Sequence, residues 1–373
     1  MSGVNTGNLW DIFCRVIDNY GDVGVSWRLA TGLAAHGERV RLWLDDPSAL
    51  AWMAPNETPN VEVRLWTEPI YLNGLAAGDV LVETFGCEIT PEFIATIAMD
   101  TMARGRKHSW INLEYLTAES YAESCHGLLS PVMSGPGAGL TKHFFYPGFT
   151  PATGGLLREP DLLARQAHFD KTVWLRTQGI DFEGEHLISL FCYEPPALEK
   201  WLDKLAQLPH PTQLLVTAGR SATALKACIE RKNRQEPAWN KHGLLLFFYL
   251  PTLTQIDFDH LLWACDMNFV RGEDSLVRAI WANKPFIWQI YPQHDDAHHA
   301  KLAAFLDALE ANPAMRASHS EWNGVTQVQE TDPTDGLIQA LSHWQLTVTQ
   351  ARDRLLKQDD LVTQLMRLAS KNP

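Results

Sequence analysis

The turn Asp18-Asn19-Tyr20-Gly21-Asp22 carries two carboxylates within five residues. Such a pair can grip a cationic group or deprotonate a hydroxylic one, so the turn is a candidate acceptor site. Structural roles compete with this hypothesis, because Asp22 suits a helix N-cap and Asp18 suits an Asx-turn. The nearby glycines are Gly21 and Gly24 only, so GxGxxG is absent, and two aspartates would repel a pyrophosphate. A nicotinamide cofactor is therefore not expected here.

The second candidate segment is Arg271-Gly272-Glu273-Asp274-Ser275. Arg271 can donate two hydrogen bonds to a phosphate, and Gly272 allows the backbone to approach it closely. The free N–H groups of a following helix would add a positive end. Glu273 is too acidic for a plain phosphate cradle and should face a sugar hydroxyl, a ribose or the acceptor. The structural alternative is that Asp274 and Ser275 serve as N-cap residues.

Two further features lie near the ends of expected strands. Phe191 and Tyr193 are two residues apart, which places both on one face of a strand. They would either pack in the core or form a platform for a nucleobase. His294 and His298 are four residues apart, but HExxH is absent, so a ligand-contacting loop around Tyr291 is favoured over a metal site. The sequence also lacks Walker, GxSxG and CxxC motifs.

Short apolar runs alternating with amphipathic stretches must position these segments. Residues 10–16, 23–36 and 39–44 predict a strand, a helix and a strand, and a loop is expected at 130–139. Further strands are expected at 61–66, 79–85, 110–113, 187–193, 213–217, 244–250, 267–270 and 285–290. Further helices are expected at 196–208, 222–229, 255–264, 275–282, 298–309 and, as one long amphipathic helix, 349–369. The pattern predicts two doubly wound α/β domains whose parallel sheets bind ligands at a cleft near the carboxyl ends of their strands.

Length, charge and cysteine content limit the possible functions. The 373 residues exceed one compact core and predict two domains. With 31 Lys and Arg against 44 Asp and Glu, the net charge of −13 argues against nucleic-acid or anionic-membrane binding. It does not argue against a local phosphate site. The six cysteines form no CxxC pair, and neither a signal peptide nor a membrane-spanning apolar run is found, so a cytoplasmic protein is expected.

The candidate segments also belong to a wider resemblance. Residues 12–30, IFCRVIDNYGDVGVSWRLA, resemble the start of the EarP family, bacterial protein-arginine rhamnosyltransferases that act on translation elongation factor P (EF-P). The resemblance continues in order through Glu83-Thr84-Phe85, residues 112–116, Pro147-Gly148-Phe149, Gly154-Gly155-Leu156, residues 271–275, Lys284-Pro285-Phe286 and residues 288–293.

This resemblance implies a GT-B fold, with two Rossmann-like domains facing across a cleft. It implies an acceptor domain of residues 1–180, completed by a C-terminal helix over 349–373, and a donor domain of residues 181–348. It further implies transfer of rhamnose from dTDP-β-L-rhamnose to an arginine of EF-P, with inversion and without a metal ion. The catalytic residues of the family correspond to Asp18, Asp22 and Glu273. The donor contacts correspond to Phe191, Tyr193, Gln255, Arg271, Asp274, Ser275 and Tyr291, and the acceptor-side candidates are Asn19, Tyr20, Glu114 and Tyr115.

The chemistry of arginine gives these residues roles. A guanidinium is a poor nucleophile, so carboxylates must hold it and localise its charge. We expect Asp18 to take the proton, Asp22 to orient the turn and the guanidinium, and Arg271 to stabilise the departing diphosphate. Glu273 would support either the acceptor or the charge that develops on the sugar ring. The alternatives are another GT-B enzyme (a small-molecule glycosyltransferase or a nucleotide-sugar epimerase) and a non-enzymatic module that binds a partner protein through a Trp-rich surface.

Overall fold

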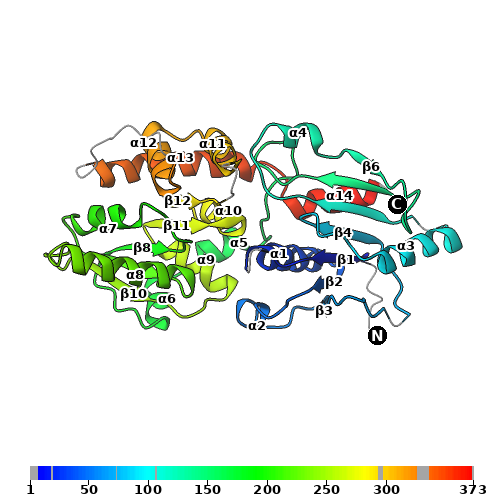
Figure 1. The fold of residues 1–373 in the computed structure, drawn as a ribbon, viewed down its shortest axis with the longest axis horizontal. Helices are drawn as coiled ribbons and strands as arrows, with labels where there is room; N and C mark the ends of the chain where they lie inside the picture. Colours follow the sequence, from blue (N-terminus) through cyan, green and yellow to red (C-terminus); the bar gives the residue numbers. More distant parts are fainter. Residues whose placement is uncertain are drawn as a thin grey trace. The chain divides into compact units, whose positions relative to one another are not determined.

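The computed structural model describes residues 7–17, 20–72, 74–105, 107–292, 297–325 and 336–371. The chain divides into two compact units, unit 1 with residues 1–162 and 355–373, and unit 2 with residues 163–354 (Figure 1). The predicted division at 180/181 and 348/349 differs from these bounds. Helix α6 (Lys171–Thr177) lies in unit 2, where Trp174 Nε1 donates a hydrogen bond to Asp257 Oδ1 at 3.1 Å.

Unit 1 contains a seven-stranded sheet in the order β3-β2-β1-β4-β5-β7-β6. Only β6 is antiparallel to its neighbour among these strands, and the other neighbours pair in parallel. The sequence did not predict β7, and β6 falls at the start of the expected loop. The strands are β1 (Leu9–Cys14), β2 (Arg39–Leu44), β3 (Val61–Leu65), β4 (Val80–Thr84), β5 (Ser109–Leu113), β6 (Leu129–Pro131) and β7 (Thr141–Phe145).

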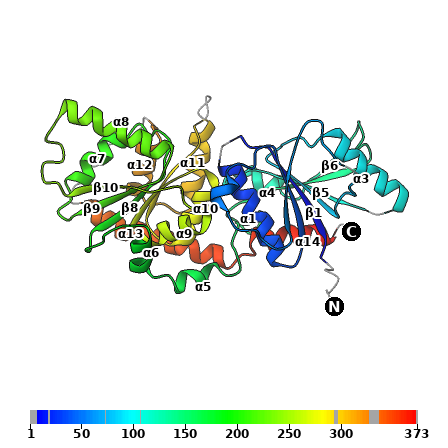
Figure 2. The ribbon, with the colours of Figure 1, turned by 90° about the horizontal axis from the view of Figure 1, so that it is seen from below.

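Helices cover both faces of this sheet. Trp10 and Ile12 of β1 face α1 (Gly21–Ala35) and α14 (Leu361–Lys371), whereas Phe13 and Trp43 face α3 (Pro91–Arg104). Figure 2 shows α1 and α14 on one side of these strands and α3 on the other. The short helices α2 (Leu50–Met53) and α4 (Tyr121–Cys125) lie in connections. The alternation of side chains along a strand thus builds two apolar layers from one sequence run.

Unit 2 contains five parallel strands in the order β10-β9-β8-β11-β12. They are β8 (His186–Leu190), β9 (Thr212–Val216), β10 (Leu245–Tyr249), β11 (Met267–Arg271) and β12 (Phe286–Gln289). The helices are α5 (Leu162–Ala167), α6, α7 (Leu198–Ala206), α8 (Arg220–Gln235), α9 (Gln255–Ala264), α10 (Gly272–Ala282), α11 (Ala297–Ala308), α12 (Pro313–Trp322) and α13 (Gly336–Leu356).

The core of unit 2 also has two apolar layers. Helices α6 and α9 pack on one face of the sheet through Trp174 and Leu261. On the other face, Trp201 of α7 and Trp322 of α12 pack on Phe269 of β11. Figure 2 shows α6 and α9 below the strands of unit 2, and α7 and α12 above them. Twelve of the fourteen tryptophans are buried in the two units, which accounts for most of the unusual Trp content as core.

The single C-terminal helix predicted over 349–369 is wrong, because the chain forms two helices there. Helix α13 ends at Leu356 and α14 begins at Leu361. Arg158 donates hydrogen bonds to the carbonyls of Leu356 and Gln358 at 3.4 and 3.3 Å, and Asp360 Oδ1 accepts from Thr363 N at 3.1 Å. These side chains satisfy backbone groups that the break leaves without helical partners. As the resemblance implied, the last helix packs on the N-terminal unit.

Within the described ranges, no helix is long and apolar enough to cross a membrane. All six cysteines are free thiols, and five of them are buried. Burial raises the pKa of Cys14, Cys87 and Cys192 to about 12 in each case, so these thiols are structural rather than reactive.

Candidate active site

The acidic turn of unit 1 connects the carboxyl end of β1 to the first turn of α1. Asp18 and Asn19 lie outside the described residues. Asp22 is 3% exposed, and its Oδ2 accepts a hydrogen bond from Ile17 N at 2.9 Å. The N-cap of α1 is Tyr20, so the N-cap prediction for Asp22 is wrong. Asp22 instead reaches back from the first turn of the helix to the backbone of Ile17.

Glu114 and Tyr115, two of the acceptor-side candidates, lie at the same edge of the sheet, where β4 and β5 end. Their register pairs Thr84 with Leu113, which brings the next residues, Phe85 and Glu114, to adjacent positions. Tyr115 stacks on Phe85 with ring centroids 4.5 Å apart and an angle of 13° between planes. Phe85 adopts φ of +57°, a left-handed conformation that bulky residues rarely take and that often marks a functional site.

Glu114 and Tyr20 differ in their surroundings. Glu114 Oε1 accepts a hydrogen bond from Asn112 Nδ2 at 2.7 Å. Burial raises the pKa of Glu114, and the charge of Glu83 acts in the same direction, while the Asn112 hydrogen bond opposes both. Tyr20 is 41% exposed and contacts Trp52 edge to face at 5.1 Å. This edge of unit 1 therefore offers an aromatic pair and carboxylates, groups suited to a planar cation.

In unit 2, the guanidinium of Arg271 lies against two aromatic rings. Its Cζ is 4.5 Å from the ring centroid of Phe191 and 4.5 Å from that of Tyr193. Its Nη1 donates to the carbonyl of Cys192 at 3.0 Å, and the residue is only 8% exposed. Phe191 and Tyr193 do share one side of the chain, as predicted, although β8 ends before them at Leu190. The structure thus brings three predicted donor residues together.

The loop that carries these rings is fixed by residues that sequence reasoning missed. Ser221 Oγ accepts from Cys192 N at 2.9 Å and also donates to Cys192 O at 3.1 Å. Gln289 Oε1 accepts from Tyr193 N at 2.8 Å. Ser221 lies in the first turn of α8 and Gln289 ends β12. Their only sequence signal was a polar side chain at the carboxyl end of a predicted strand.

The two rings differ in how much surface they leave for a nucleobase. Tyr193 is 2% exposed, because Arg271 and Arg220 both contact its ring, and Tyr291 packs edge to face on it at 5.5 Å. Phe191 is half-buried and contacts Phe258 at 5.2 Å. Tyr291 is 47% exposed. The exposed aromatic surface at this edge therefore comes from Phe191 and Tyr291 rather than from Tyr193.

Helix α10 begins at Gly272, three residues before its predicted start. Gly272 has φ of +65°, which lets the chain turn directly from β11 into the helix, and its carbonyl accepts from Trp288 Nε1 at 2.8 Å. Asp274 and Ser275 are therefore not N-cap residues. Ser275 Oγ accepts from Arg271 N at 3.0 Å and donates to Arg271 O, which fixes the backbone of the arginine.

Glu273 lies in the first turn of α10 and forms an ion pair with α11. Its Oε1 is 2.7 Å from Lys301 Nζ, and both side chains keep about a fifth of their surface exposed, 20% and 23%. Gln255 is the first residue of α9 and is half-buried. His294 lies outside the described residues, and His298 contacts His299 at 4.2 Å. Among described residues, no group of three or more His, Cys, Asp and Glu side chains is arranged to hold a metal ion.

Comparison with known proteins places this arrangement in a family. A family model described as EarP, EF-P rhamnosyltransferase, matches residues 10–370. The protein-arginine rhamnosyltransferase of Pseudomonas putida is 41% identical over 381 residues, covering 96% of this chain and 97% of the relative. A solved structure that describes the basis for EarP-mediated arginine glycosylation of EF-P is 31% identical with a TM-score of 0.63. It covers 98% of this chain and 100% of that one.

A more distant neighbour shows the fold alone. A glycosyltransferase structure from Rickettsia africae aligns over 98% of both chains with a TM-score of 0.52 at 8% identity. Together with the two parallel sheets, these neighbours confirm the predicted α/β architecture of two Rossmann-like domains, the GT-B fold. Because a family model matches residues 10–370 and a relative at 41% identity covers 96% of the chain, the chain belongs to the EarP family of EF-P rhamnosyltransferases and is a protein-arginine rhamnosyltransferase.

Proposed function

We propose that this enzyme transfers L-rhamnose from dTDP-β-L-rhamnose to an arginine side chain of EF-P, with inversion at the anomeric carbon. Family membership supports the reaction and the acceptor. The donor half of the proposal is supported by the buried Arg271, which packs against two aromatic rings at the carboxyl edge of the unit 2 sheet. Ligands of doubly wound sheets bind at this edge.

The donor side must bind a base and stabilise a departing diphosphate. Phe191 and Tyr291 offer aromatic surface for the thymine. Arg271 and the N–H groups that begin α10 supply positive charge where the diphosphate leaves. Gln255, Asp274 and Ser275 complete the proposed donor set, with Ser275 acting through the backbone of Arg271. We propose that these groups carry the diphosphate charge without a metal ion.

Transfer is a single displacement. One guanidino nitrogen of the acceptor forms a bond to the anomeric carbon as the bond from that carbon to the diphosphate oxygen breaks, and the nitrogen loses a proton. We propose Asp18 as the group that accepts this proton. An aspartate with a pKa near 4 is a weak base, so proton loss accompanies the attack rather than preceding it.

The described residues at this edge of unit 1 support this division of roles. Asp22 is buried and bonded to Ile17 N, so it acts as the orienter of the turn. Tyr115, 38% exposed over Phe85, offers a face on which a guanidinium can stack, and Glu114 offers a carboxylate beside it. Tyr20 and Asn19 would border the same acceptor.

Glu273 is a weaker candidate for the base than Asp18. Its carboxylate already forms an ion pair with Lys301, with Oε1 and Nζ 2.7 Å apart, so one of its oxygens is engaged by α11. We propose that Glu273 acts electrostatically, on the bound acceptor or on the positive charge that develops on the sugar ring. Because EF-P is a translation factor, we place the reaction in the cytoplasm.

The test is intact-mass analysis of EF-P incubated with this enzyme and dTDP-rhamnose, with and without EDTA. The proposal predicts a gain of one deoxyhexose in both conditions, and no gain when the target arginine is replaced by lysine. A mass gain that persists after the arginine is replaced would overturn the arginine acceptor. A mass gain that is lost with EDTA would overturn the reaction without a metal ion.

A variant tests the base. Asp18→Asn should lower turnover by roughly 10²–10⁴, the scale of general base catalysis, with little change in dTDP binding. The matched control is Asp307→Asn, which changes an aspartate that is 72% exposed at the end of α11. Near-normal turnover of Asp18→Asn would remove Asp18 from the base role.

A further inference from the structure

Unit 2 contains a pocket of about 400 Å³ at the amino ends of its strands. It is lined where β8 begins at His186 and β11 begins at Met267, and by Lys284 and Pro285, which directly precede β12. The predicted donor residues follow the carboxyl ends of the same strands. The pocket is therefore at the opposite edge of the sheet from Arg271, and the proposed reaction does not use it.

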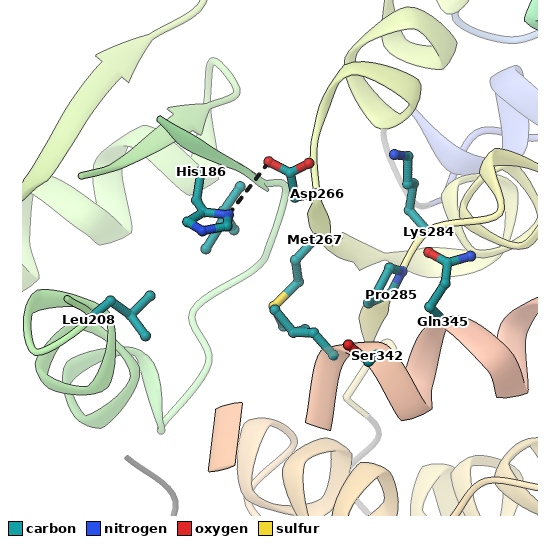
Figure 3. A pocket seen from close by; sticks show the side chains of 10 residues that line it. His186, Leu208, Asp266, Met267, Lys284, Pro285, Ser342 and Gln345 are labelled. Atoms are coloured by element: carbon teal, nitrogen blue, oxygen red, sulfur yellow. Dashed lines mark ion pairs between the residues drawn. The ribbon is translucent and has the colours of Figure 1, made fainter. Parts of the chain in front are cut away.

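The walls of the pocket are mainly apolar. Met267 and Pro285 are buried, Leu208 comes from the residues after α7, and Leu341 comes from α13. Figure 3 shows Met267 between Leu208 and His186 on one side and Ser342 of α13 on the other. A volume of about 400 Å³ falls within the range of small-molecule pockets, and apolar walls with a few polar groups are their usual lining.

The charges at this pocket do not balance. Asp266 Oδ2 accepts a hydrogen bond from Leu187 N at 2.9 Å and lies 3.9 Å from Lys171 Nζ, so Lys171 compensates its charge. Lys284 is half-buried, and it forms no hydrogen bond or ion pair with any residue that the structure describes. A partly buried ammonium that no described residue neutralises, next to apolar walls, is complementary to an anion that carries an apolar body.

The pocket is formed before any ligand arrives. Gln345 Nε2 donates to Asn283 O at 2.8 Å, and Thr349 Oγ1 donates to Asn283 Oδ1 at 2.9 Å. These bonds fix α13 to the residues that precede Lys284. On the opposite wall, Asp266 N donates to Leu187 O at 2.7 Å. Because both walls are held by hydrogen bonds, ligand binding orders few additional groups.

We propose that this pocket binds a small organic anion with an apolar body, its anionic group on Lys284 and its apolar part against Met267 and Leu341. The proposal does not depend on the donor or acceptor assignments. The ammonium and the apolar walls together define the ligand class, which is a carboxylate or sulfonate joined to an aromatic or aliphatic group.

The probe is anilinonaphthalene sulfonate, whose fluorescence rises when it enters an apolar site, with phenylnaphthylamine as its uncharged analogue. The full-length enzyme should bind the sulfonate at one saturable site, more tightly than the analogue. Saturating dTDP should leave this binding unchanged. Displacement by dTDP would assign the probe to the donor site and overturn the proposal, as would the absence of saturable binding.

Variants at Lys284 separate charge from packing. Lys284→Gln should weaken sulfonate binding roughly three- to tenfold, the scale of one partly exposed ion pair, and leave the uncharged analogue unaffected. Lys284→Arg keeps the positive charge and should therefore bind the sulfonate as tightly as the wild type. Lys241→Gln removes the same charge from an exposed position of unit 2 and should change nothing. Equal sulfonate affinity in wild type and Lys284→Gln would refute the assignment of the anion to Lys284.

Discussion

Arg271 is the residue whose removal best tests the donor half of the site. The sequence suggested a phosphate-binding arginine, but its guanidinium also packs on Phe191 and Tyr193 and donates to Cys192 O. It would therefore contribute to binding in two ways, by contacting the diphosphate and by holding the aromatic loop in place. Arg271→Ala removes both contributions, whereas Arg271→Lys keeps the charge and loses the planar contacts.

The contacts give the size of each effect. A hydrogen bond from a charged group contributes about 1.5–3 kcal/mol, and each of the two cation–π contacts adds about 0.5–1 kcal/mol. Arg271→Ala should thus destabilise unit 2 by roughly 2–5 kcal/mol in urea unfolding. Loss of a charged contact to the diphosphate should weaken dTDP binding by roughly 10- to 100-fold. Loss of the fixed Phe191 surface should weaken binding of thymidine, which has no phosphate, by roughly tenfold.

Calorimetry with dTDP and with thymidine separates the two contributions. Both ligands should bind Arg271→Ala more weakly, and Arg271→Lys should recover part of the dTDP affinity but little of the thymidine affinity. Arg231→Ala is the matched control, because Arg231 pairs with Glu199 on the exposed surface of the same unit. Unchanged thymidine affinity in Arg271→Ala would refute the view that Arg271 holds the aromatic loop, and unchanged dTDP affinity would remove it from the site.

Three other perturbations follow from contacts in unit 2. Lys301→Met removes the ion pair that holds Glu273, so turnover should fall roughly tenfold in the glycosylation assay while dTDP affinity stays constant. Asp259→Asn breaks the pair with Arg278, in which both side chains are 1% exposed, and should lower the free energy of unfolding by about 3–5 kcal/mol in urea titrations. Burial lowers the pKa of His319 from 6.5 to about 4 in the folded protein. As the pH drops from 6.5 towards 4, the unfolded chain is protonated at His319 while the folded protein is not, so the free energy of unfolding falls. His319→Met should remove up to about 3 kcal/mol of this pH dependence.

Control variants separate the Lys301 and Asp259 effects from general ones, and a refuting result exists for all three variants. Lys226→Met changes a lysine that contacts Tyr249 and should leave turnover intact; weaker dTDP binding by the Lys301 variant would contradict a role confined to Glu273. Asp307→Asn breaks an exposed pair and should shift the urea midpoint little, and an equal shift for Asp259→Asn would be inconsistent with a buried pair. Parallel pH–stability curves for wild type and His319→Met would show that His319 does not titrate as its burial implies.

The architecture could be predicted where local patterns and tertiary packing agree. The bounds of β2 and α9 match their predictions residue for residue. An apolar run marks β2, and the N-cap residue Thr254 marks the start of α9. Strand β7 was not predicted because its sequence, TKHFF, begins with polar residues and is mostly half-buried. It lies next to the edge strand β6, away from the centre of the sheet. Helix α3 was not predicted, although Pro91 in its first turn and Gly105 at its C-cap are typical helix boundaries.

The boundary errors have local physical causes. Helix α10 starts early because Gly272 can adopt a positive φ, so the chain needs no connecting residues between β11 and the helix. Helices α13 and α14 are separate because Arg158 takes the carbonyls at the break, a partner about 200 residues away that periodicity cannot reveal. The apolar spacing across residues 349–369 is compatible with one helix. The distant Arg158 and the local bond from Thr363 N to Asp360 together satisfy the backbone groups at the break.

The contacts of Arg271 could not be predicted either, because its partners are distant in the sequence. These contacts give Arg271 a structural role in addition to the proposed binding role. Its hydrogen-bond partner Cys192 is 79 residues away, and Gln289, which holds the adjacent Tyr193, is 96 residues from that tyrosine. Residue type identified a cation at the end of a strand, but only the fold shows that β8 and β11 are neighbours and that the cation is held between rings from the β8 end. If Arg271 binds the leaving group as proposed, its contacts with the loop couple donor affinity to the stability of unit 2. Substitutions that loosen the loop, at Ser221 or Gln289, should therefore weaken donor binding without touching the donor.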